Sequence, residues 1–403
     1  QKTAYEIPKR DWSSDVCSSD LTAVPFSTRN TPGAGFRQSL RIVALTPDRP
    51  MLPKTPPDHV CLLRLSAIGD TCHVVPLLRT LQHAWPDTQF TWIIGRVEAR
   101  LMSLVPDVEF ITVDKRTGLE GLLALRRQLA GRRFDVLLHL QSSLRASAVA
   151  SVIPARVKLG FDRPRSRELQ WLFTNARIAT GGREHVLDGF RGFARALGIE
   201  DFRLQWDLPL PAAALDYAAQ LIPETPGRSP GTLVISACSS HARRNWLPER
   251  YAAVAAHAVR AHGMRVILAG GPARIERDMA DAIVRHAGVP LVDQVGQDTL
   301  PQLLALLARA RALLAPDTGP VHMATMVGTP VIGLYAATNP ARSGPYLSRA
   351  WCVDAYPRAA ARYADSTPER LPWTTKLERP EVMSLIETAE VCAKLDALQS
   401  ATC

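Results

Sequence analysis

Short apolar runs alternate along most of this chain with longer segments whose apolar residues recur at helical spacing. The first run, at 59–65, is followed by a turn at 66–70 and a helical pattern at 71–85. Strand-length runs that alternate with helices indicate a parallel sheet with helices on both faces. The pattern also predicts a helix at 119–130 and further strands at 89–94, 108–113, 135–140 and 157–161.

The alternation lapses at residues 209–230, where prolines cluster. Because proline breaks regular structure, this segment is expected to be an interdomain linker. It separates a first doubly wound α/β domain at 58–208 from a second at 231–403. In the second domain the pattern predicts strands at 232–237, 265–270, 291–294, 312–315 and 331–335, and helices at 248–262, 274–286, 299–310 and 378–398.

The first 57 residues differ from the rest. Residues 1–21 have neither a regular period nor the apolar core of a signal peptide, and residues 11–21 resemble a translated sequencing adapter. Residues 22–57 are rich in Pro, Thr, Arg and Gly, a composition typical of flexible segments. We expect residues 1–57 to be a non-native or disordered extension without a functional role.

The composition allows several classes of partner. Of the 403 residues, 46% are hydrophobic and 21% charged, as in soluble globular proteins, and the net charge is +10. This charge favours an anionic partner, such as a nucleotide, a phosphorylated glycolipid, an acidic membrane surface or a nucleic acid. Solubility alone explains it equally well. The seven cysteines have no CxxC or metal-ligand spacing, which fits a reducing compartment.

The segment from Asp317 to His322 contains the clearest chemical signal. It follows an apolar run at 312–315 and leads into a helical pattern, so it reads as strand, tight loop and helix. Thr318 and Gly319 would present backbone N–H groups at a helix N-terminus, where anions bind. Gly319 lacks a Cβ, so a phosphate could come close. Asp317 would lie at the carboxyl end of the strand, where open α/β sheets bind ligands, with His322 in the first turn.

Asp70 is a candidate general base. It follows Gly69 just after the first strand, where a tight bend would point its carboxylate into a cleft. The alternative is an N-cap for the helix expected from Thr71, a common use of aspartate. Spacing alone leaves both readings open.

A basic loop follows the first strand of the second domain and holds Ser239, Ser240 and Arg244. Hydroxyl and guanidinium groups at a strand end can bind phosphate oxygens, although a solvated basic loop is the plainer reading. In the first domain Arg64, Arg96 and Arg145 could face a phosphorylated acceptor, or they could simply be exposed.

No dinucleotide fingerprint, P-loop, DxD pair or metal-spaced His/Asp/Glu group occurs, so we expect no metal and no cofactor. No recognition motif supports nucleic-acid binding.

Residues 59–390 resemble glycosyltransferase family 9, the ADP-heptose:lipopolysaccharide heptosyltransferases. Three segments carry the resemblance: Leu63–Asp70, the basic loop ending in Trp246-Leu247-Pro248, and Asp317–Ala324 with the turns at 328–330 and 338–340. Residues 172–175 and His185 resemble the heptosyltransferase I branch. Arg244 stands where the family usually has Lys, and Asn339 where Asp is common.

The resemblance implies a GT-B fold, with two Rossmann-like domains facing each other across a cleft. It implies inverting, metal-independent transfer of heptose from ADP-heptose to the Kdo/inner core of lipopolysaccharide. Residues 58–208 would bind the Kdo-lipid A acceptor, and 231–403, with a C-terminal helix, the ADP-sugar. Asp70 would be the general base. Thr318 and Gly319 would bind the diphosphate, Asp317 the sugar hydroxyls, and His322 would lie beside the phosphates.

Two alternatives remain at this stage. A family 9 enzyme could use another sugar donor or acceptor, and a related envelope protein could bind nucleotide sugars without catalysis. The segment pattern contains no apolar run near the ~20 residues that span a bilayer. We therefore expect a cytoplasmic protein that touches the inner membrane surface through basic residues.

Overall fold

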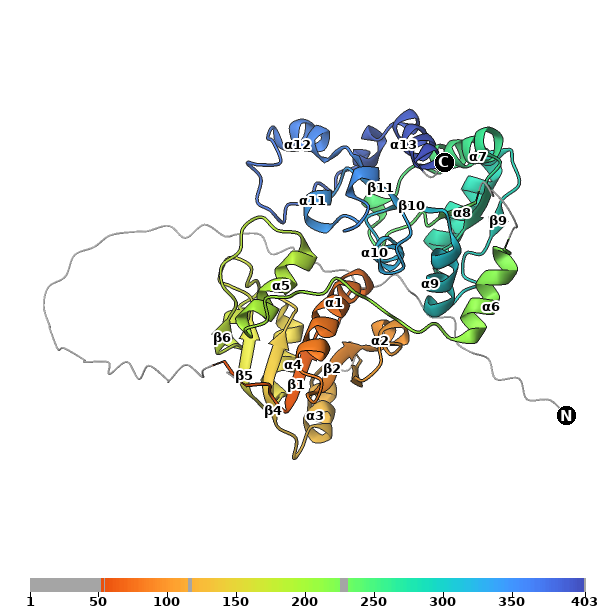
Figure 1. Cartoon of the computed structure of the whole chain (residues 1–403). Coiled ribbons are helices and arrows are strands. Elements are labelled where there is room, and N and C mark those ends of the chain that lie inside the picture. The colour runs from red at the N-terminus through yellow and green to blue at the C-terminus, as the bar shows by residue number, and fades with distance from the viewer. Residues whose placement is uncertain (1–51, 54, 115–117, 225–230, 402–403) are drawn as a thin grey trace, which may run out of the picture.

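The computed structural model describes residues 52–53, 55–114, 118–224 and 231–401. These residues form two lobes stacked one above the other, each built on its own parallel sheet (Figure 1). Apart from 52–53 and 55–57, the expected N-terminal extension lies outside the described residues.

The first lobe contains a six-stranded sheet in the order β3-β2-β1-β4-β5-β6, with every described pairing parallel. Buried residues such as Leu62 and Ile93 make its central strands largely apolar, as expected for strands covered on both faces. The strands are β1 (His59–Leu63), β2 (Gln89–Gly95), β3 (Glu109–Val113), β4 (Phe134–His139), β5 (Ala155–Gly160) and β6 (Ala176–Arg177). The helices are α1 (Ile68–Ala84), α2 (Arg96–Met102), α3 (Gly118–Gln128), α4 (Leu144–Val152), η1 (Gln170–Leu172) and α5 (Val186–Ala196).

The second lobe repeats this topology, with the strand order β12-β11-β10-β7-β8-β9. The strands are β7 (Thr232–Ile235), β8 (Arg265–Leu268), β9 (Val292–Asp293), β10 (Ala312–Pro316), β11 (Val331–Tyr335) and β12 (Val353–Asp354). The helices are α6 (Ala212–Leu221), η2 (Ala242–Arg244), α7 (Pro248–His262), α8 (Arg274–Ala287), α9 (Leu300–Arg309), α10 (Gly319–Met326), α11 (Pro340–Ser343), η3 (Arg349–Trp351), α12 (Tyr356–Ala364), η4 (Val382–Leu385) and α13 (Thr388–Ser400). The predicted α/β class with two doubly wound, Rossmann-like units is confirmed.

In both sheets the winding direction reverses between the first and fourth strands in chain order, β1 and β4 in one lobe and β7 and β10 in the other. A crevice at the carboxyl ends of the strands opens at such a switch point, and ligands bind there. The segments that follow these strands include Arg64–Asp70 and Asp317–His322, so the topology places both candidate motifs at switch points.

Several elements, among them α2, α4, α5 and α12, were not predicted from the sequence, and three predicted segments differ in the structure. Helix α1 begins at Ile68, three residues earlier than expected, so Asp70 lies inside it. The segment expected to be a linker contains α6, whose Ala214 and Ala218 pack in one buried cluster with Ala305 of α9. The helix expected from 378 is broken, because Pro380 disfavours helical backbone before it, and η4 and α13 follow separately.

The lobes pack closely along α1 and α10, which lie side by side at the centre of the molecule (Figure 1). One buried apolar cluster includes residues of both sheets, among them Val60 of β1 and Leu313 of β10. Polar contacts add to this packing. The Trp373 indole N–H donates to the Glu184 carbonyl at 2.8 Å, and His185 Nε2 lies 2.9 Å from the Gly344 carbonyl oxygen.

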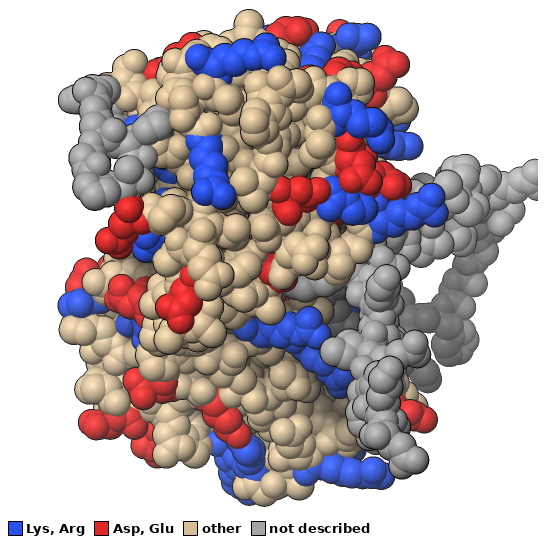
Figure 2. Space-filling view, turned by 90° about the vertical axis from the view of Figure 1, so that its right-hand side faces the viewer, with Lys and Arg blue, Asp and Glu red and all other residues tan. Residues whose placement is uncertain are grey.

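Charged side chains are spread over the molecular surface. On the face shown in Figure 2, basic and acidic groups are interspersed, and no single-sign patch covers it. Among the described helices, none combines the length and apolar character needed to cross a bilayer.

Candidate functional site

The N-terminus of α1 holds Asp70 in the third helical position. The Thr71 N–H donates to the Ala67 carbonyl at 2.9 Å, which makes Ala67 the N-cap. The Ala67 N–H in turn points at an Asp70 carboxylate oxygen 3.5 Å away. A carboxylate in the first turn is stabilised by the positive end of the helix dipole. Asp70 is therefore not the N-cap itself, and its side chain is 36% exposed.

Arg64 fixes the orientation and charge of Asp70. Its guanidinium donates to the Leu140 carbonyl at 2.6 Å and forms an ion pair with the Asp70 carboxylate. Burial raises the pKa of Asp70, but the charges of Arg64, His322 and Arg342 outweigh it and hold that pKa below its ordinary value. The carboxylate is thus ionised at neutral pH and can accept a proton. The arginine expected on the acceptor side is a direct partner of the candidate base.

His322, the fourth residue of α10, lies against Gly69 across the lobe interface. A Cβ on Gly69 would overlap His322 Cδ2 and lie 3.1 Å from Nε2. The ring is 8% exposed, and its centroid is 4.5 Å from that of His73 on α1. Burial lowers the pKa of His322, although the charges of Asp317 and Asp70 oppose the shift. The structure therefore brings together the two motifs that the sequence singled out.

The segment Asp317–His322, called the anion loop below after its expected role, connects β10 to α10, so the predicted order of strand, tight loop and helix is observed. Thr318 is the N-cap and Gly319 the first helical residue, so their backbone N–H groups have no acceptor within the helix. Pro320 follows and has no N–H, which reduces the number of amides available. A Cβ on Gly319 would meet Ile68 of α1 only at 3.6 Å, an ordinary contact. The packing alone therefore does not require glycine there.

Arg244 lies beside the anion loop and is engaged by two carboxylates. Its Nε and a terminal nitrogen donate to Glu378 Oε1 at 2.8 and 2.6 Å, and its other terminal nitrogen is 3.4 Å from Asp317 Oδ2. The Arg244 side chain is only 15% exposed. Burial raises the pKa of Glu378, but the hydrogen bond and charge of Arg244 bring it below its ordinary value. These three groups form a largely buried cluster of paired charges.

Arg342 and Lys376, two further cations near Asp317, were not identified from the sequence. Arg342 of α11 has a lowered pKa, first because of burial, while Asp70 and Asp317 act in the opposite direction. Burial also lowers the pKa of Lys376, and the charge of Arg244 adds to that effect. Both interact electrostatically with Asp317. The turn at 338–340 is part of the family resemblance and could have drawn attention to Arg342. Lys376 and Glu378 lie in an irregular segment without a motif, so nothing in the sequence indicated them.

Four other candidate residues contribute less directly. The Ser239 backbone N–H donates to Asn245 Oδ1 at 2.7 Å, and its hydroxyl accepts from the His241 N–H at 3.4 Å, so this side chain shapes the loop. Ser240 is exposed. Arg96 is 68% exposed and lies 3.4 Å from Asp114, and Arg145 is exposed on α4. Neither Arg96 nor Arg145 is placed against Asp70 by any described ion pair.

A cavity lies at the carboxyl ends of β7 and β8. Its lining includes Cys238, Ala269, Glu276 and Val295. The Gly271 N–H donates to the Glu276 carboxylate at 2.5 Å. Burial raises the pKa of Glu276 and raises that of Asp298 to about 7. Perturbed carboxyl groups at a strand-end crevice are typical of ligand sites.

Taken together, the site combines an ionised carboxylate from the first lobe with helix amides and guanidinium groups from the second. Such an arrangement can accept a proton on one side and stabilise a growing negative charge on the other. These are the requirements of transfer from a phosphorylated leaving group to a hydroxyl.

Comparison with known proteins identifies a family. Residues 122–370 match the model of glycosyltransferase family 9 (heptosyltransferase). The chain is 39% identical over 342 residues to the lipopolysaccharide core heptosyltransferase OpsX of Haemophilus influenzae, covering 85% of this chain and 97% of that protein. It is 27% identical over 361 residues to lipopolysaccharide heptosyltransferase 1 of Pseudomonas aeruginosa, covering 84% and 98%.

Solved structures share the fold. A family 9 glycosyl transferase from Veillonella parvula superposes with a TM-score of 0.69 at 21% identity, covering 85% of this chain and 97% of that one. The E. coli heptosyltransferase WaaC with ADP superposes with a TM-score of 0.60 at 24% identity, covering 72% and 90%. The expected GT-B architecture is confirmed.

The contact between Gly69 and His322 can be tested with Gly69→Ala. The overlap with the buried ring is severe, so it should cost about 3 kcal/mol, at the upper end of the range of about 1–3 kcal/mol for overpacking, of which the better helix propensity of alanine would offset about 1 kcal/mol. Urea denaturation should therefore show a lower free energy of unfolding. Gly182→Ala is the matched control, because nothing lies within 4 Å of the added Cβ. Equal stability of the two variants would contradict this packing.

Proposed function

The chain belongs to glycosyltransferase family 9, the heptosyltransferases, and on that premise we propose that it transfers a heptose from ADP-heptose to the Kdo/inner core of lipopolysaccharide. The observation that carries the proposal is the meeting of Asp70 with His322 and the anion loop where α1 and α10 adjoin. The Haemophilus relative is a lipopolysaccharide core heptosyltransferase, which supports the class of acceptor.

The second lobe is proposed to bind the donor. The Thr318 and Gly319 amides and the Arg244 guanidinium would hold the diphosphate, and Asp317 would accept hydrogen bonds from heptose hydroxyls. The exposed hydroxyl of Ser240 lies in the same loop as Arg244. The cavity beside Glu276 lies at the same edge of the sheet, and it would have to widen from about 10 Å³ to admit the nucleoside. A bound diphosphate would take over Arg244 N–H groups that now donate to Glu378.

The first lobe is proposed to bind the Kdo-lipid A acceptor. Asp70 removes the proton from the attacking hydroxyl as that oxygen bonds to the anomeric carbon. The bond from the anomeric carbon to the diphosphate oxygen breaks at the same time, and its electron pair leaves with ADP. Attack opposite the leaving group inverts the anomeric configuration. Arg244 and the α10 amides stabilise the departing charge, so the step needs no metal ion.

Arg64 has two effects on this step. Its charge keeps Asp70 ionised and ready to accept a proton, and its bond to the Leu140 carbonyl holds the pair in place. A lowered pKa also makes a carboxylate a weaker base. Proton transfer would therefore come late, when the forming bond has made the attacking hydroxyl strongly acidic.

A cytoplasmic location with contact to the inner membrane surface is part of the same proposal, because the lipid acceptor lies there. Leu119 and Leu123 of α3 and Leu144 of α4 are exposed, and α3 and α4 contact each other. The exposed basic residues Arg126 and Arg145 lie on the same two helices. Exposed apolar and basic side chains on two neighbouring helices would favour an anionic membrane. Arg96 and Arg145 are proposed to face the acceptor.

The proposed reaction is tested with purified protein and a panel of donors and acceptors, analysed by mass spectrometry. We expect one heptose to be added to a deacylated Kdo-lipid A acceptor from ADP-heptose, without added metal and in the presence of EDTA. Transfer only from another nucleotide sugar, or only to another acceptor, would make the chain a family 9 enzyme of different specificity.

Replacing Asp70 by Asn tests the base. Because the amide cannot accept the proton, kcat should fall about 10²- to 10⁴-fold, while KM for ADP-heptose should change little. Asp87→Asn, at an exposed position beyond the other end of α1, is the control and should keep normal turnover. Near-normal kcat in Asp70→Asn would remove Asp70 from the catalytic role.

Replacing Arg244 by Ala tests the diphosphate contact. Loss of a charge-assisted bond worth about 1.5–3 kcal/mol should weaken ADP binding about 10- to 100-fold in calorimetry and also lower kcat. Arg260→Ala, an exposed substitution on α7, should bind ADP normally. Unchanged ADP affinity in Arg244→Ala would place the diphosphate elsewhere.

A further inference from the structure

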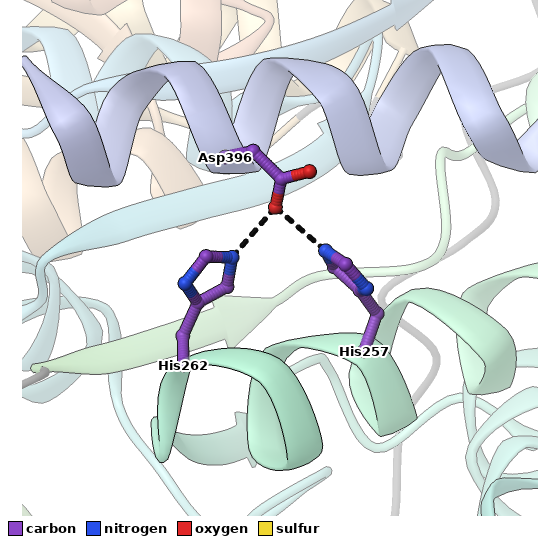
Figure 3. Close-up of side chains that lie close together, drawn as sticks. All are labelled: His257, His262 and Asp396. Atoms are coloured by element: carbon purple, nitrogen blue, oxygen red, sulfur yellow. Dashed lines mark hydrogen bonds and ion pairs between the residues drawn. The ribbon is translucent and has the colours of Figure 1, made fainter.

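Two histidines and one carboxylate meet at a point outside the site described above. His257 and His262 lie on α7 and Asp396 on α13, as Figure 3 shows. The Nε2 atom of each histidine is 2.6 Å from the same oxygen, Asp396 Oδ1. Their ligand atoms all lie within 4.8 Å of one another. In Figure 1, α7 and α13 lie at the outer edge of the second lobe, away from the junction of α1 and α10.

The local structure explains how this group forms. His262 is the last residue of α7, and Gly263, with φ of 64°, ends the helix. The two rings cross at 84° with their centroids 5.3 Å apart, so they do not stack and approach the carboxylate with their Nε2 edges. Helix α13 is fixed above them by its buried residues Val391, Leu395 and Leu398. The three groups are therefore held by packed helices rather than by loops.

We propose that His257, His262 and Asp396 bind a divalent transition metal of the zinc class. Two neutral imidazoles and one carboxylate are ligands that zinc takes in proteins, whereas magnesium and calcium prefer oxygen ligands alone. The sequence does not reveal this group, because the two histidines are five residues apart and Asp396 lies 134 positions after His262. From the sequence we expected no metal site in this chain, and the proposed site departs from that expectation at a place away from the transfer site.

The geometry requires only a small adjustment. With bonds near 2.0–2.1 Å, ligand atoms around a tetrahedral zinc are about 3.3 Å apart. The carboxylate oxygen would therefore move outward by about 0.7 Å from each nitrogen, and the two nitrogens, which lie within 4.8 Å of each other, would adjust to the same spacing by small rotations of their rings. The His257, His262 and Asp396 side chains are 31%, 22% and 48% exposed, which leaves a path for the ion and room for a water as fourth ligand.

Metal binding would tie the C-terminal helix to α7. A ligand that binds only the folded state stabilises it by mass action. Without a metal, the same residues form two hydrogen bonds to one carboxylate oxygen. Asp396→Asn separates these cases, because its amide oxygen still accepts both hydrogen bonds but is a much poorer metal ligand than a carboxylate.

The experiment uses the full chain, freed of any affinity tag and treated with EDTA before dialysis. Calorimetric titration with zinc chloride should show one site per chain, and Co²⁺ should give the visible absorption of a tetrahedral complex. His257→Ala, His262→Ala and Asp396→Asn should each bind zinc at least about tenfold more weakly. Zinc should also slow amide hydrogen exchange in α13 of the wild type but not of Asp396→Asn.

His286→Ala, which removes an exposed histidine from α8, is the control and should bind zinc like the wild type. The melting temperature without zinc reports whether each variant is folded. If a variant is unfolded, His262→Gln is tested in its place. Equal zinc affinity of wild type and the folded ligand variants, or unchanged exchange in α13, would overturn the proposal. Since no readout involves heptose transfer, the result is independent of the proposed reaction.

Discussion

The close approach of two helix N-termini, one from each lobe, is the constraint on which the site depends. Gly69 at the start of α1 leaves room for the His322 ring from α10, and Gly319 at the start of α10 lies near Ile68 of α1. Two positive helix ends that face each other repel unless negative charge lies between them. Asp70 and Asp317 supply such charge within the protein. The same electrostatic field favours an anionic substrate, so the packing of the lobes and the chemistry of the site have one origin.

The charged groups at this junction are paired across segments that are distant in the chain. Arg64 pairs with Asp70, and Arg244 with Asp317 and Glu378. Half-buried guanidinium groups are costly without partners, and carboxylates provide them in the absence of a ligand. In the proposed reaction a diphosphate would replace part of this pairing. Binding would then exchange one anion for another instead of introducing an unpaired charge.

The C-terminal segment connects the two lobes and completes the site. The Trp373 indole and the Thr374 hydroxyl contact Glu184 and Arg167 of the first lobe, and Glu378 then reaches Arg244 of the second. Further along, α13 returns along α7. The proposed metal site lies on this last helix. Its role would be to stabilise the end of the same segment that brings Glu378 and Lys376 close to Arg244.

The sequence by itself determined the alternation of strands and helices, because apolar periodicity reflects which faces must be buried. It also located the anion loop, since a strand followed by Asp-Thr-Gly and a helix start is a local pattern, and α7 was predicted at its observed bounds. Only the tertiary structure decided how distant groups combine. Nothing near Glu378 or Asp396 in the chain indicates the partners of these carboxylates, and α6 was hidden by flanking prolines. Such contacts depend on the relative placement of packed lobes and helices, which no local pattern encodes.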